Sequence, residues 1–393
     1  MIEQCKDKIR YRFENFGGIV AGEHPPFLAY VDRNFMREMG LGESSRWSGA
    51  EDEIGVLTAP TEVHFAVTNR CTGECPHCYM DAGPANGEEL DTRAMKLALE
   101  VLARQKVFHV AMGGGEALER KDLFEIAQHA RSLGLVPNLT VSGRGLTADI
   151  ADRMRVFGQV NVSLDGIGDL SGVFRGRDTF GIADRALELL VAAGIPTGIN
   201  CVLGRGNFDG VEGLFKYAAR RGLNEIEFLR LKPAGRGTRL YEAEKTTFAQ
   251  NFALIPRLAD LSRRHGVTAK IDCSFVPMLC CHDPNPEILE ALATCGCEAG
   301  NVLMGIRSDG RVSGCSFLPS RGDSVFDLPS VLRDGAGPAL PREWTQRAPE
   351  PCRSCRYVRI CKGGCHAVSL HVIGRFEAPD PDCPRVVEFG GES

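Results

Sequence analysis

The sequence predicts an α/β fold with parallel strands, followed by a cysteine-rich C-terminal region. Between residues 62 and 231, six apolar runs typical of strands alternate with segments of helical periodicity. Eleven of the 16 cysteines fall between Cys273 and Cys383, where this periodicity weakens. Alternating strands and helices predict parallel pairing with right-handed crossovers, which fits a barrel, a partial barrel or a doubly wound sheet.

The elements of the α/β region follow one another in a regular order. The predicted strands are 62–68, 107–113, 137–142, 159–165, 197–203 and 225–231. The predicted helices between them are 91–105, 123–134, 148–158, 181–194 and 209–222. Four of these five helices end at glycine, as helix C-termini often do. A longer helical run, 244–265, follows the last strand.

The first 60 residues form a separate unit in this pattern. Apolar runs at 16–20 and 26–31 predict a hairpin, a short helix is expected at 32–40, and the Gly/Ser/acidic stretch 41–53 predicts a linker. We therefore expect four parts, namely an N-terminal segment 1–60, a core 61–240, a bridging helix and linker 241–290, and a cysteine-rich domain 291–393.

Composition narrows the functional class. The chain has 393 residues and a net charge of −5, with no basic cluster, so nucleic-acid binding is not expected. No apolar run reaches the length of a membrane span, and the charged N-terminus lacks the apolar segment of a signal peptide. The expected location is the cytoplasm, where clustered cysteines more often bind metal than form disulfides.

Three cysteines and a glycine-rich turn follow the first two predicted strands. Cys71, Cys75 and Cys78 have the spacing C-x3-C-x2-C, one thiolate short of a closed zinc or iron–sulfur site. The alternative is a zinc loop completed by His77 or a distant residue. The next strand ends in three glycines and Glu116, a carboxylate that can accept hydrogen bonds from an ammonium group. A phosphate loop would instead need Gly-Lys-Ser/Thr.

Seven cysteines near the C-terminus form a second pattern. Cys297 and Cys315 are followed by a C-x2-C-x5-C-x3-C run and a last cysteine, whose members are Cys352, Cys355, Cys361, Cys365 and Cys383. Seven thiols are too many for one tetrahedral metal, so two zinc ribbons are the structural alternative. The absence of Cys-x2-Cys-His argues against covalently attached haem.

The order of C-x3-C-x2-C and Gly-Gly-Glu resembles the radical S-adenosylmethionine (SAM) superfamily over roughly residues 62–232. The resemblance implies a partial (β/α)6 TIM-like barrel and a [4Fe–4S] cluster held by Cys71, Cys75 and Cys78, with SAM on the fourth iron. It also implies an enzyme that cleaves SAM to a 5′-deoxyadenosyl radical. An external reductant such as flavodoxin or ferredoxin would supply the electron.

The same resemblance implies the SAM contacts. Gly114, Gly115 and Glu116 would hold the methionine amine, and Arg175 would reach the carboxylate of SAM. Ser163 and Asp165 fall on the ribose-binding strand, and Leu229 on the strand that flanks adenine. Ser142 stands where the family often has Ser/Thr-Asn-Gly, but this chain has Ser-Gly-Arg, which puts that contact in doubt. The sequence does not show a catalytic acid or base.

The C-terminal pattern resembles the SPASM extension of radical SAM enzymes, which binds two auxiliary [4Fe–4S] clusters. By this resemblance, Cys297, Cys315 and Cys365 would hold the first auxiliary cluster, and Cys352, Cys355, Cys361 and Cys383 the second. The fourth position of the first cluster is open or filled by Cys280, Cys281 or Cys295. The remaining Cys5, Cys201 and Cys273 are expected to be buried thiols.

The segment "RLKPAGRGT", 230–238, together with the SPASM pattern most resembles peptide-modifying enzymes such as the mycofactocin maturases. This implies oxidoreductase chemistry on a ribosomally made precursor peptide: a crosslink, thioether, decarboxylation or epimerisation. Residues 1–60 would be a partial peptide-recognition module or a cap on the barrel, and a separate recognition protein could then be needed. The alternatives are a maturase of a folded protein (sulfatase-type), a small-metabolite enzyme, and a non-enzymatic iron–sulfur or zinc scaffold.

Overall fold

The structure, a computed structural model, describes residues 9–23, 26–48, 55–84, 87–334 and 344–391. Six parallel strands form its centre and pair in sequence order. They are β4 (Glu62–Thr68), β5 (His109–Gly114), β6 (Val136–Val141), β7 (Val160–Ser163), β8 (Thr197–Leu203) and β9 (Glu225–Arg230). All six predicted strands are confirmed, with ends that differ by two residues or fewer.

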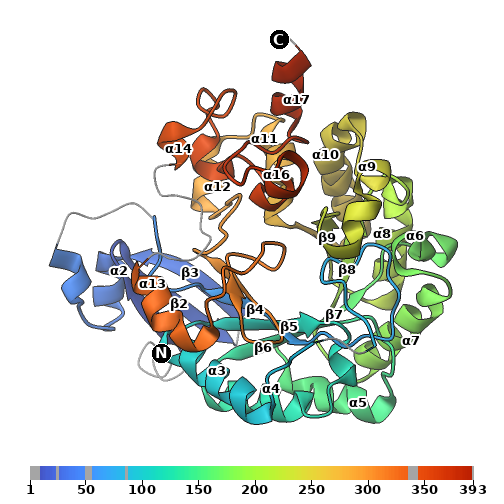
Figure 1. The fold of residues 1–393 in the computed structure, drawn as a ribbon, viewed down its shortest axis with the longest axis horizontal. Coiled ribbons are helices and arrows are strands. Elements are labelled where there is room, and N and C mark those ends of the chain that lie inside the picture. Colours follow the sequence, from blue (N-terminus) through green and yellow to red (C-terminus); the bar gives the residue numbers. More distant parts are fainter. Residues whose placement is uncertain (1–8, 24–25, 49–54, 85–86, 335–343, 392–393) are drawn as a thin grey trace.

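Helices cover one face of this curved sheet (Figure 1). They are α3 (Thr92–Arg104), α4 (Leu123–Ser132), α5 (Ala148–Arg153), α6 (Gly172–Arg175), α7 (Thr179–Ala192) and α8 (Val211–Arg221). Alternate strand residues such as Val63, Phe65 and Val67 pack under them in one large apolar core. The intervening residues, among them Glu62 and His64, point to the inner face and are half-buried. The inner face of the half-barrel therefore carries polar side chains that are partly accessible.

The sheet extends beyond the six predicted strands at both edges. At one edge β10 (Thr268–Ile271) pairs parallel to β9, and at the other β11 (Leu303–Ile306) pairs parallel to β4. The two-residue strand β12 (Val312–Ser313) completes a nine-stranded sheet. Strands on both sides of the predicted domain limits at residues 240 and 290 thus belong to one sheet. The domain limits given above therefore stay a prediction.

The N-terminal segment is a three-stranded antiparallel sheet with one short helix, α2 (Arg33–Glu38). The predicted hairpin is confirmed as β2 (Gly17–Glu23) and β3 (Pro26–Asp32). A further strand, β1 (Arg10–Glu14), was not predicted. Its buried residues are the charged Arg12 and Glu14, which form an ion pair of 2.8 Å. This is the reverse of the usual strand, in which the apolar residues are buried.

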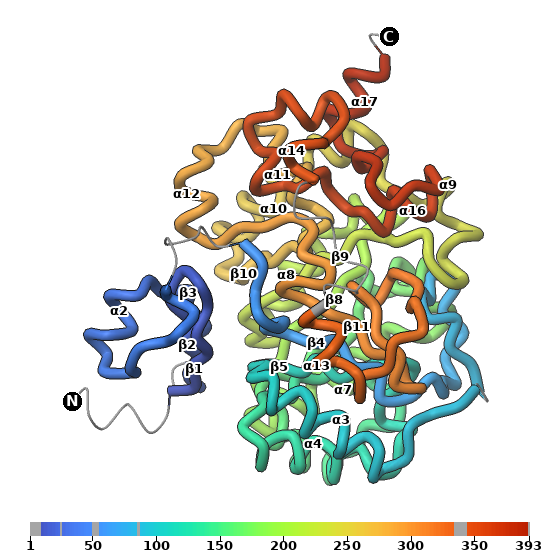
Figure 2. The backbone as a smooth tube through the Cα atoms, turned by 60° about the vertical axis from the view of Figure 1, so that its left-hand side comes forward, coloured from blue at the N-terminus to red at the C-terminus, as the bar shows by residue number. Residues whose placement is uncertain are grey.

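This small sheet docks at the amino ends of the barrel strands. The Arg12 guanidinium donates to the carbonyl oxygens of Ala59 and Pro60, before β4, and of Lys106, before β5. Arg10 donates to Phe108 and Gly134 in the same way. Figure 2 shows the sheet as a separate lobe beside the barrel. It therefore lies at the end of the barrel opposite to the loops that carry Cys71 and Glu116.

Most of the C-terminal region is built from short helices above the barrel in Figure 1, whereas the helix Leu328–Asp334 lies lower, at the left and near α3. The predicted helix 244–265 is confirmed as α10 (Phe248–His265), which begins at a capping box of Thr247 and Gln250. The other helices are α9 (Tyr241–Glu244), α11 (Val276–Cys280), α12 (Pro286–Ala291), α13 (Leu328–Asp334), α14 (Trp344–Arg347), α15 (Val358–Cys361), α16 (His366–Ile373) and α17 (Pro384–Gly391). Within the described ranges, none of the helices combines the length and hydrophobicity needed to cross a bilayer.

Candidate functional site

The loop after β4 carries the first three cysteines, two of which flank a glycine. A Cβ built on Gly73 would lie 3.3 Å from Cys71 Sγ and 3.9 Å from Cys75 Sγ, and the Gly73 amide donates to Cys71 Sγ over 3.2 Å. Cys78 Sγ accepts from the Ala82 amide at 3.4 Å. Burial raises the pKa values of Cys71 and Cys75, so a bound cation is needed to keep them as thiolates. The donor set therefore fits an iron–sulfur cluster.

The segment after β9 holds this loop in place. The Arg236 side chain donates from Nε to Cys75 O at 3.1 Å and from Nη1 to Ala82 O at 2.6 Å, and its amide donates to Cys78 O at 2.9 Å. Gly235 has a φ of +56°, and a Cβ there would meet Cys78 O at 2.5 Å. Only glycine allows this approach, so the two segments are shaped for each other.

The glycines at the end of β5 mainly allow two loops to pack closely, and to a smaller extent allow a ligand to approach. A Cβ on Gly114 would lie 2.2 Å from Thr68 O, and one on Gly115 would lie 2.0 Å from Arg70 O. The Gly115 and Glu116 amides donate to these same two carbonyl oxygens. Gly113 alone faces open space, with nothing within 4 Å of its Cβ position. The run therefore fixes the strand end against the base of the cysteine loop and leaves one open position beside it.

Glu116 is buried, with 1% of its surface exposed, and its carboxylate is paired inside the protein. Oε2 accepts from the Ser142 amide at 3.0 Å and from the Ser142 hydroxyl. Burial raises its pKa, and the hydrogen bonds from Ser142 oppose that shift. Ser142 thus lies beside Glu116 at the carboxyl end of β6 and orients its carboxylate.

Asp165 and Arg175 form a second buried pair. Arg175 Nε lies 2.6 Å from Asp165 Oδ2, and Asp165 Oδ1 accepts from the Val202 amide at 2.7 Å. Burial lowers the pKa of Arg175, but the charges of Asp165 and Cys75 and the hydrogen bond to Asp165 together raise it above its usual value. His77, whose Nε2 is 3.8 Å from Asp165 Oδ2, has its pKa lowered to about 4, first by burial and then by Arg175. It is therefore neutral at pH 7.

Ser163 and Leu229 are half-buried on the strands where they were expected. Ser163 is the last residue of β7 and pairs with Asn200 of β8, and Leu229 in β9 pairs with Val202. The structure thus brings all the predicted SAM-contact residues to the carboxyl ends of β5–β9, on loops or strands that face the cysteine loop. Their contacts with SAM stay predictions.

The C-terminal cysteines lie in two groups, and their roles as cluster ligands stay predictions. Cys297, Cys315 and Cys365 are near neighbours: burial and then the other thiols of the group raise the pKa values of Cys297 and Cys315 to about 12. They border one apolar cluster that contains Phe174 of the barrel.

The second group lines a cavity of its own, between α11, α15 and the start of α17. Its walls contain Cys352, Cys355, Cys361 and Cys383, the four predicted ligands, and also Cys280. Burial raises the pKa values of Cys352 and Cys383 to about 12. Four convergent thiols around a cavity are the donor set of an iron–sulfur cluster.

The cysteines outside the pattern are placed differently from expectation. Cys281 donates to Met278 O at 3.2 Å, and the charged neighbours of Cys295 are Glu298 and Lys362. Cys273, expected to be buried, is exposed to solvent in the turn after the edge strand β10. Desolvation by neighbouring protein atoms, then Asp272, Cys297 and Cys365, raise its pKa. Cys201 is buried as expected, and Cys5 lies outside the described residues.

Comparison with known proteins gives the family of this site. The model of the radical SAM superfamily matches residues 65–218. The mycofactocin maturase MftC of Mycobacterium ulcerans is 30% identical over 338 residues, which cover 83% of this chain and 88% of that protein. The chain belongs to the radical SAM superfamily. It is therefore an enzyme of that superfamily, whose members use a [4Fe–4S] cluster and SAM.

Other relatives share most of its length. The PqqA peptide cyclase of Ruegeria pomeroyi is 30% identical over 351 residues, covering 86% of this chain and 91% of the cyclase. The crystal structure of Streptococcus suis SuiB bound to S-adenosylmethionine has a TM-score of 0.73 at 16% identity, covering 96% of this chain and 99% of SuiB. Native anSMEcpe with bound AdoMet and a Cp18Cys peptide has a TM-score of 0.64 at 19% identity, covering 84% and 96%. The predicted α/β radical SAM fold is confirmed.

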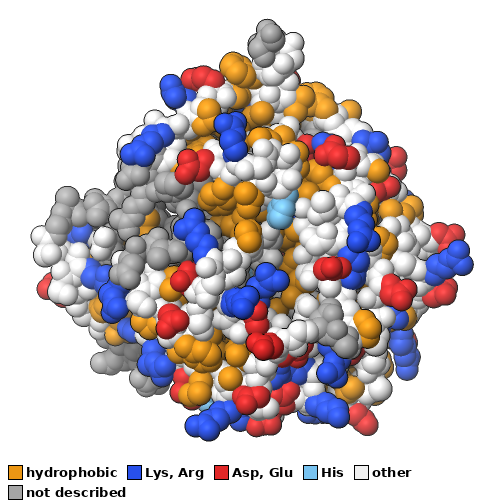
Figure 3. Space-filling view, in the orientation of Figure 1, with side chains coloured by type: hydrophobic (Ala, Val, Ile, Leu, Met, Phe, Trp, Pro, Cys, Tyr) orange, Lys and Arg blue, Asp and Glu red, His pale blue; other side chains and the backbone are white. Residues whose placement is uncertain are grey.

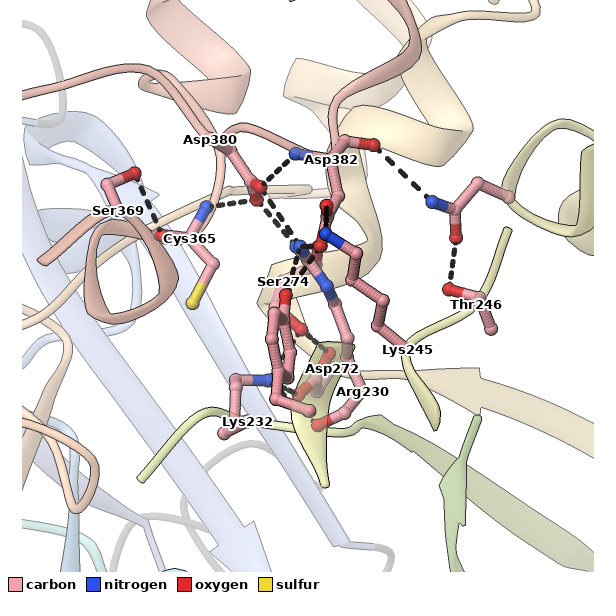
Figure 4. A network of polar contacts seen from close by, with 12 residues as sticks. Arg230, Lys232, Lys245, Thr246, Asp272, Ser274, Cys365, Ser369, Asp380 and Asp382 are labelled. Carbon is pink, nitrogen blue, oxygen red and sulfur yellow. Dashed lines mark hydrogen bonds and ion pairs between the residues drawn. The ribbon is translucent and has the colours of Figure 1, made fainter. Parts of the chain in front are cut away.

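A buried polar network, not predicted from the sequence, joins the radical SAM barrel to the C-terminal cysteines (Figure 4). Arg230, at the end of β9, lies 2.5 Å from Asp380 Oδ2 and 2.6 Å from Asp382 Oδ2. Asp380 also accepts from the Cys365 amide at 2.9 Å, and Asp382 precedes Cys383. Arg230 therefore fixes one residue of the first cysteine group and the neighbour of one in the second.

An aromatic pair joins the two cysteine loops that face the radical SAM barrel. The rings of Tyr79 and Phe317 have centroids 4.7 Å apart, and the Tyr79 hydroxyl hydrogen-bonds Ser316. Tyr79 directly follows Cys78, and Ser316 directly follows Cys315. On the face shown in Figure 3, apolar side chains gather near the centre, where barrel and C-terminal region meet.

Proposed function

We propose that this radical SAM enzyme modifies a ribosomally made precursor peptide. Relatives that cover most of its length are named mycofactocin maturase and PqqA peptide cyclase, and SuiB, which shares its fold, has been solved with the precursor peptide SuiA. The observation that carries the proposal is the polar inner face of the half-barrel, with partly accessible residues such as Glu62 and His64, beside the loop of Cys71, Cys75 and Cys78. We expect a peptide segment to enter there in extended form.

The residues at the carboxyl ends of the strands fit the cluster and SAM. Cys71, Cys75 and Cys78 would hold the cluster, which with SAM supplies one-electron cleavage of the sulfonium to methionine and a hydrogen-abstracting radical. Glu116, oriented by Ser142, would accept hydrogen bonds from the methionine amine beside Gly114 and Gly115. Ser163, Asp165 and Leu229 would line the nucleoside.

Arg175 would bind the SAM carboxylate while Asp165 holds its guanidinium. Because the Arg175–Asp165 pair already exists in the protein, the guanidinium is positioned before SAM arrives, which lowers the ordering cost of binding. The side of the Arg175 guanidinium that faces away from Asp165 can donate to a second acceptor, the carboxylate of SAM.

Two auxiliary [4Fe–4S] clusters would occupy the two C-terminal cysteine groups. The first would be held by Cys297, Cys315 and Cys365, and the second by Cys352, Cys355, Cys361 and Cys383. Cys273 is the best-placed fourth thiol for the first group, because Cys297 and Cys365 are among its charged neighbours and its thiol is accessible. An iron left open in its absence would be available to a substrate thiol.

The peptide would be brought by a recognition surface away from the barrel mouth. In the small N-terminal sheet β3 is an edge strand, and its residues are exposed or half-buried, as needed for an added peptide strand. The lobe lies at the amino ends of the barrel strands, so a leader bound there would have to pass round the barrel. A separate recognition protein and an external reductant, such as flavodoxin or ferredoxin, complete the expected partners.

The test uses anaerobically reconstituted enzyme, dithionite, SAM and a short precursor peptide encoded beside its gene. The proposal predicts a mass change in the peptide, dependent on SAM, with 5′-deoxyadenosine formed in step. If 5′-deoxyadenosine forms but only a folded protein or a small metabolite is changed, the peptide assignment is wrong while the radical SAM chemistry stands.

A further inference from the structure

The cavity of the second cysteine group holds one thiol more than a cluster needs. Cys280 lines it together with Cys352, Cys355, Cys361 and Cys383. A [4Fe–4S] cluster has four irons and takes one thiolate on each. The family pattern accounts for four of these cysteines and leaves Cys280 over.

Cys280 lies next to one particular member of the four. It ends α11 and Cys361 ends α15, and these two helices pack against each other. Both cysteines are buried, at 3% and 9% exposure, in one apolar cluster with Val276 and Tyr357. The two thiols therefore line the same part of the cavity and can reach the same metal position.

The surroundings hold Cys280 at this place. It is the last residue of α11, and its carbonyl oxygen accepts from Arg385 Nη2 at 3.3 Å. The same Arg385 nitrogen donates to Asp283 Oδ1 at 2.6 Å, and the Tyr357 hydroxyl donates to Pro284 O at 2.7 Å. These contacts tie the end of α11 to both α17 and the turn before α15. Cys280 therefore belongs to this cavity and not to the first cysteine group.

We propose that Cys280 and Cys361 are interchangeable ligands for one iron of the second auxiliary cluster; this rests on the cluster assignment of the proposed function. One sulfur ligates as thiolate while the other stays a thiol beside it. In an exchange, the incoming thiol passes its proton to the departing thiolate, one iron–sulfur bond forms as the other breaks, and no electrons are transferred. The cluster thus keeps four thiolate ligands throughout.

The spare thiol protects the site against loss of a ligand. Oxidation or alkylation of Cys361 would normally leave an iron open and the cluster labile. With Cys280 in reach, the vacated position is refilled from within the cavity. Cys352, which shares the cavity but lies outside the buried apolar cluster of Cys280 and Cys361, lacks this replacement.

The test counts iron and sulfide per chain in anaerobically reconstituted full-length enzyme. Wild type, Cys280→Ala and Cys361→Ala are each expected to hold about twelve irons. The Cys280→Ala/Cys361→Ala double variant and the matched control Cys352→Ala are expected to hold about eight. The remaining auxiliary signal in electron paramagnetic resonance spectra identifies which cluster is lost.

Each other outcome overturns the inference. Loss of four irons in Cys361→Ala alone, as in Cys352→Ala, shows that Cys280 cannot replace it. Loss in Cys280→Ala alone makes Cys280 an obligatory ligand. If Cys361→Ala does not fold, Cys361→Ser with and without Cys280→Ala gives the same comparison. A wild-type count of about eight or fewer contradicts the proposed clusters themselves, which separates that failure from failure of the exchange.

Discussion

Arg230 and Asp380, 150 positions apart in the sequence, form a buried two-pronged ion pair, with nitrogen–oxygen contacts of 2.5 and 3.0 Å. The pair joins the end of β9, a strand of the SAM-binding barrel, to the segment between Cys365 of the first cysteine group and Cys383 of the second. Because Asp380 also accepts the Cys365 amide, the position of Cys365 in the first cysteine group depends on this pair.

Arg230→Met is expected to lower the unfolding free energy by about 3–5 kcal/mol, because it leaves Asp380 buried without its partner. It should also lower the iron content, with auxiliary clusters lost before the SAM-binding one. Thermal unfolding and iron counts of holoenzyme measure both effects. Arg257→Met, which removes an ion pair to the exposed Asp209, is the control, with an expected change of less than about 1 kcal/mol. Equal effects of the two variants would refute the structural role of Arg230.

Gly115→Ala is expected to displace the cysteine loop, because its Cβ would lie 2.0 Å from Arg70 O, next to Cys71. The enzyme should then lose about four irons and its SAM cleavage. Gly113→Ala is the matched control: its Cβ meets nothing within 4 Å, so iron content should stay at the wild-type level. Retention of the SAM-binding cluster in Gly115→Ala would show that the close packing of these loops is dispensable.

Glu227, on the inner face of β9, should make stability fall as pH rises. Burial, then Asp272 and Glu62, raises its pKa to about 7, so the folded state holds a proton that the unfolded chain has already released above pH 5. Between about pH 4.5 and 7 wild type therefore loses stability, by about 2 kcal/mol after allowance for partial exposure.

Glu227→Gln removes that loss, so its melting temperature relative to wild type should rise from pH 5 to pH 8. Thermal unfolding of anaerobic holoenzyme across this range measures it. Glu188→Gln, on the exposed side of α7 where Glu188 pairs with Arg185, should follow the wild-type profile. A constant difference between Glu227→Gln and wild type across the range would contradict the raised pKa.

Tyr79→Ala is expected to weaken the contact between the SAM-cluster loop and the loop of Cys315, because it removes a ring pair worth roughly 0.5–1.5 kcal/mol beyond its buried area. Tyr79→Phe keeps the ring and loses only the hydrogen bond to Ser316. The melting temperature of holoenzyme should therefore drop more in Tyr79→Ala than in Tyr79→Phe. A larger drop in melting temperature in Tyr79→Phe than in Tyr79→Ala would show that the hydroxyl, and not the ring, connects the two loops.

The barrel strands could be predicted because their outward-facing residues are apolar at period two and their helices end at glycines. Strand β1 could not, because its buried side chains are Arg12 and Glu14. Their charges are balanced by each other, by carbonyl oxygens from residues 59–106 and by hydrogen bonds that Thr58 donates to Glu14. Strands β10 and β12 have four and two residues, too few for a periodic signal.

At the site, the residues that carry sequence motifs were found, and those defined by distant pairing were missed. Cys71, Cys75, Cys78 and Glu116 stand in spaced motifs. Arg230 reads as an ordinary strand residue until Asp380 is placed beside it. Cys280 lies outside the SPASM pattern, and only the fold shows which cysteine group it joins.

The most direct test of the radical SAM/SPASM assignment is an iron and sulfide count on anaerobically reconstituted enzyme, combined with SAM cleavage. We predict about twelve irons per chain and 5′-deoxyadenosine formation in the presence of a reductant. The Cys71→Ala/Cys75→Ala/Cys78→Ala variant should hold about eight irons and form none. Zinc in place of iron, or no cleavage of SAM by enzyme that holds its full complement of iron, would contradict the account.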